Sequence, residues 1–157
     1  MNDFLPPGDY LPHAFPMVLL DKVRAVDDDS AVCHVKVAPE GVLAPFLDSN
    51  NALPGWFVLE IMAQTIGVWS GLHGLENGEF PNVGLLLGTR GLRCERPSFP
   101  QGSELVCYIH LSLRDEKLGS FECVITLDGE QIASARLSTY QPDEQELKQL
   151  LLPQINS

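Results

Sequence analysis

The chain has 157 residues, of which 45% are hydrophobic and 20% are charged. This length and balance are typical of an ordinary soluble globular protein with one sizeable core. The net charge of -11 repels phosphate backbones and anionic membrane surfaces, so the sequence argues against nucleic-acid binding. The most apolar run, residues 56–72, contains Glu60 and Gln64 and has no basic flank, so we expect no membrane span.

Nothing in the sequence divides the chain into parts. It has no internal repeat or linker, and residues 1–7 lack the basic region and apolar run of a signal peptide. We therefore expect one cytoplasmic domain over residues 1–157, with its core in residues 11–140.

The four cysteines form no C-x-x-C pair. Cys33, Cys107 and Cys123 stand in apolar, strand-like runs, where a free cysteine packs as a small hydrophobic side chain. We expect no disulfide and no metal site. The sequence also contains no glycine-rich phosphate loop and no G-x-S-x-G nucleophile motif, so no cofactor is expected.

Two strands are expected ahead of the longest apolar run. Residues 17–26 are mostly apolar and end at an acidic turn, residues 27–30. Residues 31–37 alternate between two sets of side chains with a period of two, which indicates a second strand. Residues 39–53 contain two prolines, a glycine and an Asn-Asn pair, and this composition predicts a loop.

Residues 56–69 predict a helix that is buried on nearly every side, because almost all of its residues are apolar. Pro54 suits the start of a helix, where the N–H that proline lacks would have no intrahelical partner. Glu60, Gln64, Gly67 and Gly71 are spaced four, three and four residues apart, so they form one narrow stripe on the helix. The sequence thus places a carboxylate on a helix that is otherwise apolar and expected to be buried.

Antiparallel strands are expected after this helix. Residues 83–87 begin a strand and residues 90–96 continue as a basic, extended stretch, followed by a turn at residues 97–102. Alternating patterns then predict three more strands, which are residues 105–113, 121–127 and 131–140, with Asp128-Gly129 as a tight hairpin turn. The order indicates an α+β fold in which an antiparallel sheet wraps around one long central helix. Residues 143–151 predict a short C-terminal helix with a capping box.

Glu60 is the strongest candidate for a chemical role. A carboxylate on an apolar helix loses hydration unless it is paired, hydrogen-bonded or protonated, and such groups often serve as general acids or bases. The alternative is that Glu60 only ties the helix to a neighbouring backbone. Gln64, one turn later, can hold a carboxylate or bridge two chains, and a structural role is favoured for it.

The helix start, His13 and Asp48 are further candidates, each with a structural alternative. The helix start at Gly55 and Trp56 offers N–H groups and the positive end of the helix dipole, which could polarise a thioester carbonyl. His13 stands between Pro12 and Pro16, which stiffen its loop, although a structural histidine is favoured there.

Asp48 could be a second carboxylate near Glu60, but a loop-turn role is favoured. The other histidines have simpler interpretations. His34 and His110 are expected to face solvent or a subunit interface, and His73 is expected to be exposed.

Three stretches together resemble the beta-hydroxyacyl-acyl carrier protein dehydratases. Residues 11–23, LPHAFPMVLLDKV, resemble the family's opening L-P-H-R-Y-P-F-L-L-V-D-R-V. Residues 53–64, LPGWFVLEIMAQ, match its M-P-G-x-x-x-x-E-A-x-A-Q with the spacing intact, and residues 99–105 are similar to its V-x-P-G-D-x-L turn. Within the family, the chain looks like the ApeP-type dehydratase-like proteins associated with aryl polyene biosynthesis.

The resemblance implies a hotdog fold, an obligate dimer and a substrate tunnel where two subunits meet. In the family, a glutamate on the helix works with a histidine from the other subunit to remove water from a 3-hydroxyacyl thioester. Glu60 occupies the glutamate position. The family's G-H-F-P-G, however, is missing, and counting back without gaps puts Phe46 where the histidine belongs.

Three hypotheses follow. The first is a 3-hydroxyacyl-[acyl carrier protein] dehydratase that uses Glu60, with His13 in place of the lost histidine. The second is a non-catalytic subunit that binds acyl thioesters and pairs with an active dehydratase. Across the hypotheses, the assembly is either a homodimer or a heteromer with a related hotdog dehydratase. The third is an acyl thioesterase in which Glu60 and Asp48 activate or replace water. The residues expected to line the substrate site are Gly55, Trp56, Gln64, Phe46 and Asp48.

Overall fold

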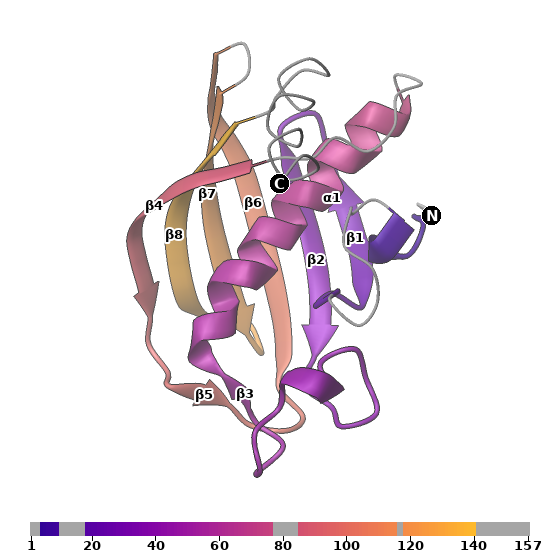
Figure 1. Cartoon of the computed structure of the whole chain (residues 1–157), viewed down its shortest axis with the longest axis vertical. Coiled ribbons are helices and arrows are strands. Elements are labelled where there is room, and N and C mark those ends of the chain that lie inside the picture. The colour runs from indigo at the N-terminus through magenta and orange to yellow at the C-terminus, as the bar shows by residue number, and fades with distance from the viewer. Residues whose placement is uncertain (1–3, 10–17, 77–84, 116–117, 141–157) are drawn as a thin grey trace, which may run out of the picture.

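The computed structural model describes residues 4–9, 18–76, 85–115 and 118–140. A six-stranded antiparallel sheet curves around one long helix, α1 (Val58–Glu76), and a small pair of strands lies near the start of that helix (Figure 1). This is the arrangement of sheet and central helix that the sequence predicts.

The large sheet has the strand order β1-β2-β6-β7-β8-β4, so β1 and β4 are its two edges. Its strands are β1 (Lys22–Val26), β2 (Ser30–Lys36), β4 (Leu85–Cys94), β6 (Glu104–Asp115), β7 (Leu118–Leu127) and β8 (Glu130–Tyr140). The hairpin between β7 and β8 turns at Asp128 and Gly129, whose φ angles are 49° and 88°. Two successive positive φ angles are what a two-residue hairpin turn requires, so the predicted turn is confirmed.

The first strand is shorter than residues 17–26. Ahead of Lys22 the chain is held irregularly: the Asp21 N–H donates to the His34 carbonyl at 2.8 Å, and the Asp21 carboxylate accepts the Lys36 N–H at 2.8 Å. The Asp21 side chain thus binds a backbone N–H of Lys36 that regular strand pairing would use, and the regular pairing of β1 with β2 ends here.

Two expected irregular segments contain short elements. Part of the predicted turn at residues 97–102 is β5 (Ser98–Phe99), which pairs with β3 (Leu53–Pro54) in a separate two-stranded sheet. The predicted loop before the helix contains a 3-10 turn, Ala44–Phe46. Residues 143–151, the expected C-terminal helix, lie outside the described residues.

Helix α1 (Val58–Glu76) begins two residues after the predicted start at residue 56 and runs seven residues beyond the predicted end at residue 69. Pro54 has φ -57° and ψ 141°, and a 3-10 turn (Gly55–Phe57) leads directly into the α-helix. The helix packs mainly on β2, β6 and β7, and Ile61, Met62 and Val68 are almost fully buried. Among residues 4–9, 18–76, 85–115 and 118–140, no helix has both the length and the apolarity to cross a membrane.

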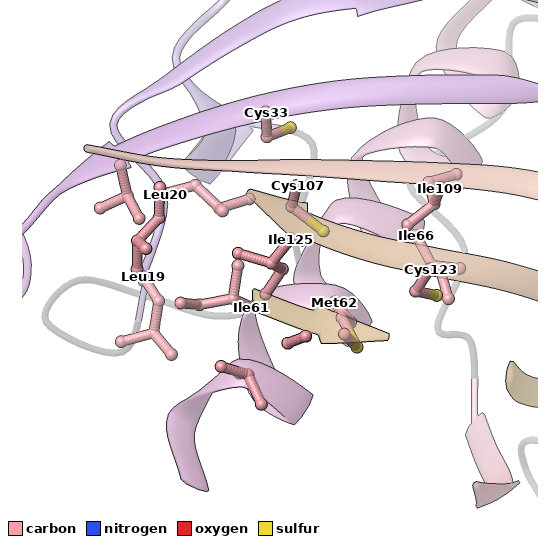
Figure 2. Close-up of a cluster of buried hydrophobic side chains, with 14 of the residues drawn as sticks. Leu19, Leu20, Cys33, Ile61, Met62, Ile66, Cys107, Ile109, Cys123 and Ile125 are labelled. Carbon is pink, nitrogen blue, oxygen red and sulfur yellow. The ribbon is translucent and has the colours of Figure 1, made fainter. Parts of the chain in front are cut away.

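The core lies between α1 and the inner face of the sheet (Figure 2). The inner positions of the central strands carry Cys33, Cys107, Ile109, Cys123 and Ile125, all of them buried. The four cysteines of the chain are free thiols, and burial raises the pKa of Cys33 to about 12. The three strand cysteines therefore act as small hydrophobic residues, as their alternation in the sequence predicts.

Candidate functional site

Glu60 lies in the first turn of α1, half-buried, and its carboxylate accepts a hydrogen bond from the side-chain amide of Gln64. The Gln64 Nε2 to Glu60 Oε1 distance is 3.2 Å. The two residues are four apart, so the helix itself places them on one face, as their spacing predicts. The pair gives the first turn of the helix a carboxylate with a fixed orientation.

Gln64 also fixes a second segment of the chain. Its Oε1 accepts the backbone N–H of Leu19 at 2.7 Å, and its side chain is only 1% exposed. The amide thus joins the helix to the segment that leads into β1. This contact supports the structural role favoured for Gln64, while its bond to Glu60 makes it a positioning residue for the carboxylate.

The backbone at Gly55 is used for packing. Its N–H donates to the Pro97 carbonyl at 2.8 Å, and an added Cβ would lie 2.6 Å from the Arg96 carbonyl oxygen. Glycine is therefore required at this position, because the backbone of Arg96 and Pro97, just before β5, passes in direct contact with it. The Gly55 N–H was a sequence-based candidate for polarising a thioester carbonyl, and in the structure it donates to Pro97 instead.

Three aromatic residues meet at the start of the helix. The ring centroids of Phe46 and Phe57 are 5.4 Å apart, and those of Trp56 and Phe57 are 6.0 Å apart. Trp56 is 75% exposed, so a large apolar ring stands in solvent one turn before Glu60. The position where the resemblance expects a histidine is thus occupied by a ring that packs into an aromatic cluster.

Asp48 holds its own loop. Its Oδ1 accepts the N–H groups of Asn50 at 2.8 Å and Ala52 at 3.1 Å, and its N–H donates to the Ala52 carbonyl at 2.9 Å. This is the loop-turn role that was the favoured alternative for Asp48.

The described histidines lie in other parts of the fold than Glu60. His34 and His110 are on the outer face of the sheet, opposite to α1, because their neighbours Cys33 and Ile109 face the core. His73 lies on α1 itself, roughly 20 Å further along the axis at about 1.5 Å per residue. His13 lies outside the described residues.

Two of these histidines differ from expectation. His34 does not face solvent: it is 8% exposed, and among the described residues neither of its ring nitrogens has a hydrogen-bond partner. Burial, together with the nearby Arg24, lowers its pKa. His73 is also not simply exposed, since its Nε2 lies 2.9 Å from the Asp27 carbonyl and its ring packs edge-on against Trp69.

Sequence reasoning missed Cys94 at this site. Its thiol donates to the Arg96 carbonyl at 3.2 Å and lies 3.8 Å from the Gly55 carbonyl. The last residue of β4 therefore touches the start of the helix. No local pattern signals this contact, because it depends on how two distant segments cross.

The acidic turn after β1 forms a separate hollow of about 500 Å³, lined by Val26, Asp27, Asp28, Asp29, Leu72 and His73. It lies at the opposite end of α1 from Glu60. Among the residues that the structure describes, no group of three or more histidine, cysteine, aspartate or glutamate side chains could hold a metal ion.

Comparison with known proteins identifies close sequence relatives. A sequence model of the family described as ApeP-like, ApeP dehydratase, matches residues 5–151. The 3-hydroxyacyl-[acyl-carrier-protein] dehydratase FabZ of Acinetobacter baumannii is 31% identical over 142 residues, which cover 87% of this chain and 94% of that protein. FabZ of Brucella abortus is 28% identical over 130 residues, with 82% and 81% covered.

Solved structures agree with this relationship. A chain of the dehydratase heterocomplex ApeI:P from Xenorhabdus doucetiae superposes with a TM-score of 0.88 at 50% identity, covering 95% of this chain and 99% of that one. A protein from Streptococcus pneumoniae described as a hypothetical thioesterase superposes with a TM-score of 0.60 at 13% identity, covering 77% of this chain and 84% of that one. The second likeness shows the shared hotdog fold alone.

Proposed function

This chain belongs to the ApeP-like dehydratase family of hotdog proteins, and we propose that it supplies the carboxylate of a two-chain 3-hydroxyacyl-thioester dehydratase. In this proposal Glu60 acts together with a histidine from a second, related hotdog chain. The substrate is a 3-hydroxyacyl group carried as a thioester on an acyl carrier protein, as the names of the FabZ relatives state for those proteins.

The position of Phe46 is the observation that supports this division of labour. The Phe46 ring packs against Phe57 at 5.4 Å, so the position aligned with the family's histidine has no group that can carry a proton. His34 and His110 lie on the outer face of the sheet, and His73 lies roughly 20 Å further along α1, so none of the three is placed to replace it. The imidazole must then come from a partner chain or from His13.

The chemistry needs two groups on opposite sides of the reacting bond. One group takes a proton from C2, which the thioester carbonyl acidifies, and the other gives a proton to the departing 3-hydroxyl group, so that water leaves and a 2-enoyl thioester remains. We assign the first role to the partner's histidine and the second to Glu60. Gln64 orients the Glu60 carboxylate through the bond to Oε1.

A heteromer explains why one chain can lose its histidine. In a pair of related chains, each site takes the carboxylate from one chain and the imidazole from the other. A pair made of this chain and a histidine-bearing partner keeps one complete site, built on Glu60. The ApeI:P heterocomplex, which contains a chain 50% identical to this one, provides a precedent for such pairing.

The test is a dehydration assay on a 3-hydroxyacyl-carrier thioester, with loss of water followed by mass spectrometry. It compares this chain alone, ApeI of Xenorhabdus doucetiae alone, and the two mixed. We expect turnover in the mixture to fall by at least about a hundredfold with Glu60→Gln, since loss of a general acid typically costs about two to four orders of magnitude. His13→Ala should leave it nearly unchanged.

Phe46→His provides a gain-of-function control. Because it restores an imidazole at the aligned position, the variant alone should gain turnover that a second change, Glu60→Gln, removes. Equal turnover by wild type and Glu60→Gln in the mixture would contradict the proposal. Loss of turnover with His13→Ala in a folded protein would instead assign the imidazole to this chain.

A further inference from the structure

The chain leaves the large sheet at Asp21. The sequence predicts a strand over residues 17–26, yet β1 begins only after Asp21. Residues 18–20 are all buried, whereas the residues of a regular strand alternate between the two faces of a sheet. Figure 2 shows Leu19 and Leu20 among the side chains that are buried between α1 and the sheet. This segment therefore does not continue the pattern of the strand that follows it.

The Asp21 carboxylate takes the place of a backbone acceptor at the end of β2. Lys22 stands opposite His34 in the pairing of β1 with β2. Continued by two residues, the same register would set Leu20 opposite Lys36, with the Leu20 carbonyl as the acceptor for the Lys36 N–H. In the structure, Asp21 Oδ2 accepts that N–H at 2.8 Å, and the Asp21 N–H donates to the His34 carbonyl at 2.8 Å. Because a side chain satisfies this donor, the backbone before Asp21 is free to turn away from β2.

The turn away from β2 brings Leu19 to the helix. The Leu19 N–H donates to Gln64 Oε1 at 2.7 Å, and the other end of the same amide donates to Glu60 Oε1 at 3.2 Å. The Gln64 side chain is buried, so its bond to Leu19 is shielded from water, which strengthens it. Only two steps along the backbone, about 7 Å of extended chain, separate Leu19 from Asp21. A change at Asp21 is therefore carried directly to the Leu19 N–H.

Two arrangements of residues 18–20 compete for the same backbone groups. If β1 lengthened, Leu20 would pair with Lys36, and the Leu19 N–H would point away from β2 and from the helix. The apolar run at the start of residues 17–26 favours this lengthened strand. The Asp21 carboxylate favours the observed arrangement, because it gives the Lys36 N–H a charge-assisted acceptor.

We propose that Asp21 is a positioning residue for the Glu60 carboxylate. By accepting the Lys36 N–H it ends β1 and directs Leu19 to Gln64, and Gln64 in turn orients Glu60 for the transfer of its proton. The inference deepens the proposed function and rests on it, because the orientation of the carboxylate affects turnover only if Glu60 is the general acid. Asp21 touches no reacting atom in this scheme and acts through the backbone of residues 18–20.

Asp21→Leu removes the acceptor and keeps a side chain of similar size. In the dehydration assay with ApeI of Xenorhabdus doucetiae, we expect kcat to fall about tenfold or more with little change in KM, because a misplaced acid slows the chemical step and leaves substrate binding intact. Asp21→Asn keeps an acceptor oxygen without the charge, so its kcat should stay close to that of wild type. A wild-type kcat for Asp21→Leu, or an equal loss in Asp21→Asn, would overturn the inference.

Phe121→Leu is the matched control for a general loss of stability. Phe121 is buried and packs edge-on against Trp69 in the second half of α1, so its truncation weakens the core away from Glu60. This variant should melt at a lower temperature than wild type and keep its kcat. If it loses kcat in the same proportion as Asp21→Leu, the loss at Asp21 reflects stability alone and the inference fails.

Amide hydrogen exchange on the full chain, followed by NMR, reads the same contact without substrate. The Leu19 N–H should exchange at least about tenfold faster in Asp21→Leu than in wild type, because it loses its bond to Gln64. Wild-type protection of Leu19 in that variant would overturn the inference whatever the kinetics. If the wild-type mixture shows no turnover while Leu19 loses protection in Asp21→Leu, the dehydratase function fails and the control of the Gln64–Glu60 pair by Asp21 stands.

Discussion

The side-chain amide of Gln64 holds the carboxylate of Glu60 and the backbone of Leu19 at the same time. Nε2 donates to Glu60 Oε1 at 3.2 Å, and Oε1 accepts the Leu19 N–H at 2.7 Å. Because the two bonds use opposite ends of the amide, they also fix which end faces the carboxylate. The orientation of Glu60 is thus tied to the chain segment that enters β1.

Gln64→Leu should separate stability from catalysis. The variant keeps the volume but leaves the Leu19 N–H without its acceptor in a buried place, so the free energy of unfolding should fall by about 1–3 kcal/mol. The kcat of the two-chain dehydratase should fall as well, with KM less affected, because Glu60 loses its orientation. Urea unfolding and steady-state kinetics measure the two effects.

Thr65→Val is the matched control for that change. Thr65 is also fully buried on α1, and its hydroxyl donates to the Ile61 carbonyl of its own helix at 2.8 Å and lies within hydrogen-bond reach of the Cys33 and Cys107 thiols. We expect this variant to keep its kcat. An equal loss of kcat in both variants would show that the effect of Gln64 comes from general packing.

Gly55→Ala should destabilise the fold by about 1–3 kcal/mol, which is typical of forced overpacking. The new Cβ would lie 2.6 Å from the Arg96 carbonyl oxygen, which is part of the backbone and cannot rotate away. Gly88→Ala is the control, since a Cβ there meets nothing within 4 Å, and thermal unfolding compares the two. Similar melting temperatures for both variants would contradict the close backbone approach at Gly55.

Iodoacetamide should label Cys94 first in the folded protein. Cys94 is partly exposed, whereas burial raises the pKa values of Cys33 and Cys123 to about 12 and that of Cys107 well above its ordinary value. At pH 8 a thiol with that pKa is ionised in roughly one molecule in ten thousand, and the thiolate is the reactive form. Peptide mass spectrometry should therefore find one modified cysteine before denaturant and four after it. Early labelling of Cys107 would mean that the core opens readily.

His34 should make the protein less stable as the pH falls below neutrality. Burial lowers its pKa in the folded state below the ordinary 6.5, and the facing Arg24 and Lys22 lower it further while Glu104 and Asp21 partly oppose them. Between 6.5 and that lower pKa the unfolded chain binds more protons, so the free energy of unfolding declines as the pH drops through this window. Above 6.5 both states are neutral and the effect is absent.

His34→Val isolates this contribution, because valine suits a strand and stands opposite Val106 of β6. Between about pH 8 and pH 5 the melting temperature should fall less steeply for the variant than for wild type. Parallel curves for the two proteins would show that His34 is charged in the folded state or is not buried in solution.

The large elements could be predicted from the sequence because each repeats a local pattern many times. The apolar run that forms α1 and the period-two patterns around Cys33, Cys107 and Cys123 are examples. The strands β3 and β5 could not be predicted, since two residues are too few to show a period. The early end of β1 depends on where one side chain, Asp21, finds a backbone donor.

In the candidate site too, contacts within one element could be predicted and contacts between distant segments could not. The pair Glu60 and Gln64 follows from a spacing of four on one helix. The contacts Gln64 to Leu19, Phe46 to Phe57 and Cys94 to Gly55 join segments far apart in the chain, and the burial of His34 depends on its neighbours across two strands. The spacing of residues along the sequence carries no information about contacts between segments that are distant in the chain.

The two tryptophans of the chain lie in opposite environments. Trp56 is 75% exposed at the start of the helix, and Trp69 is 8% exposed with its indole N–H directed at the Asp27 carbonyl at 3.2 Å. Their fluorescence is therefore separable: iodide should quench Trp56 and spare Trp69. A Trp69→Phe variant keeps an intrinsic optical reporter of events beside Glu60, and a Trp56→Phe variant keeps a reporter of core integrity, both without an attached dye.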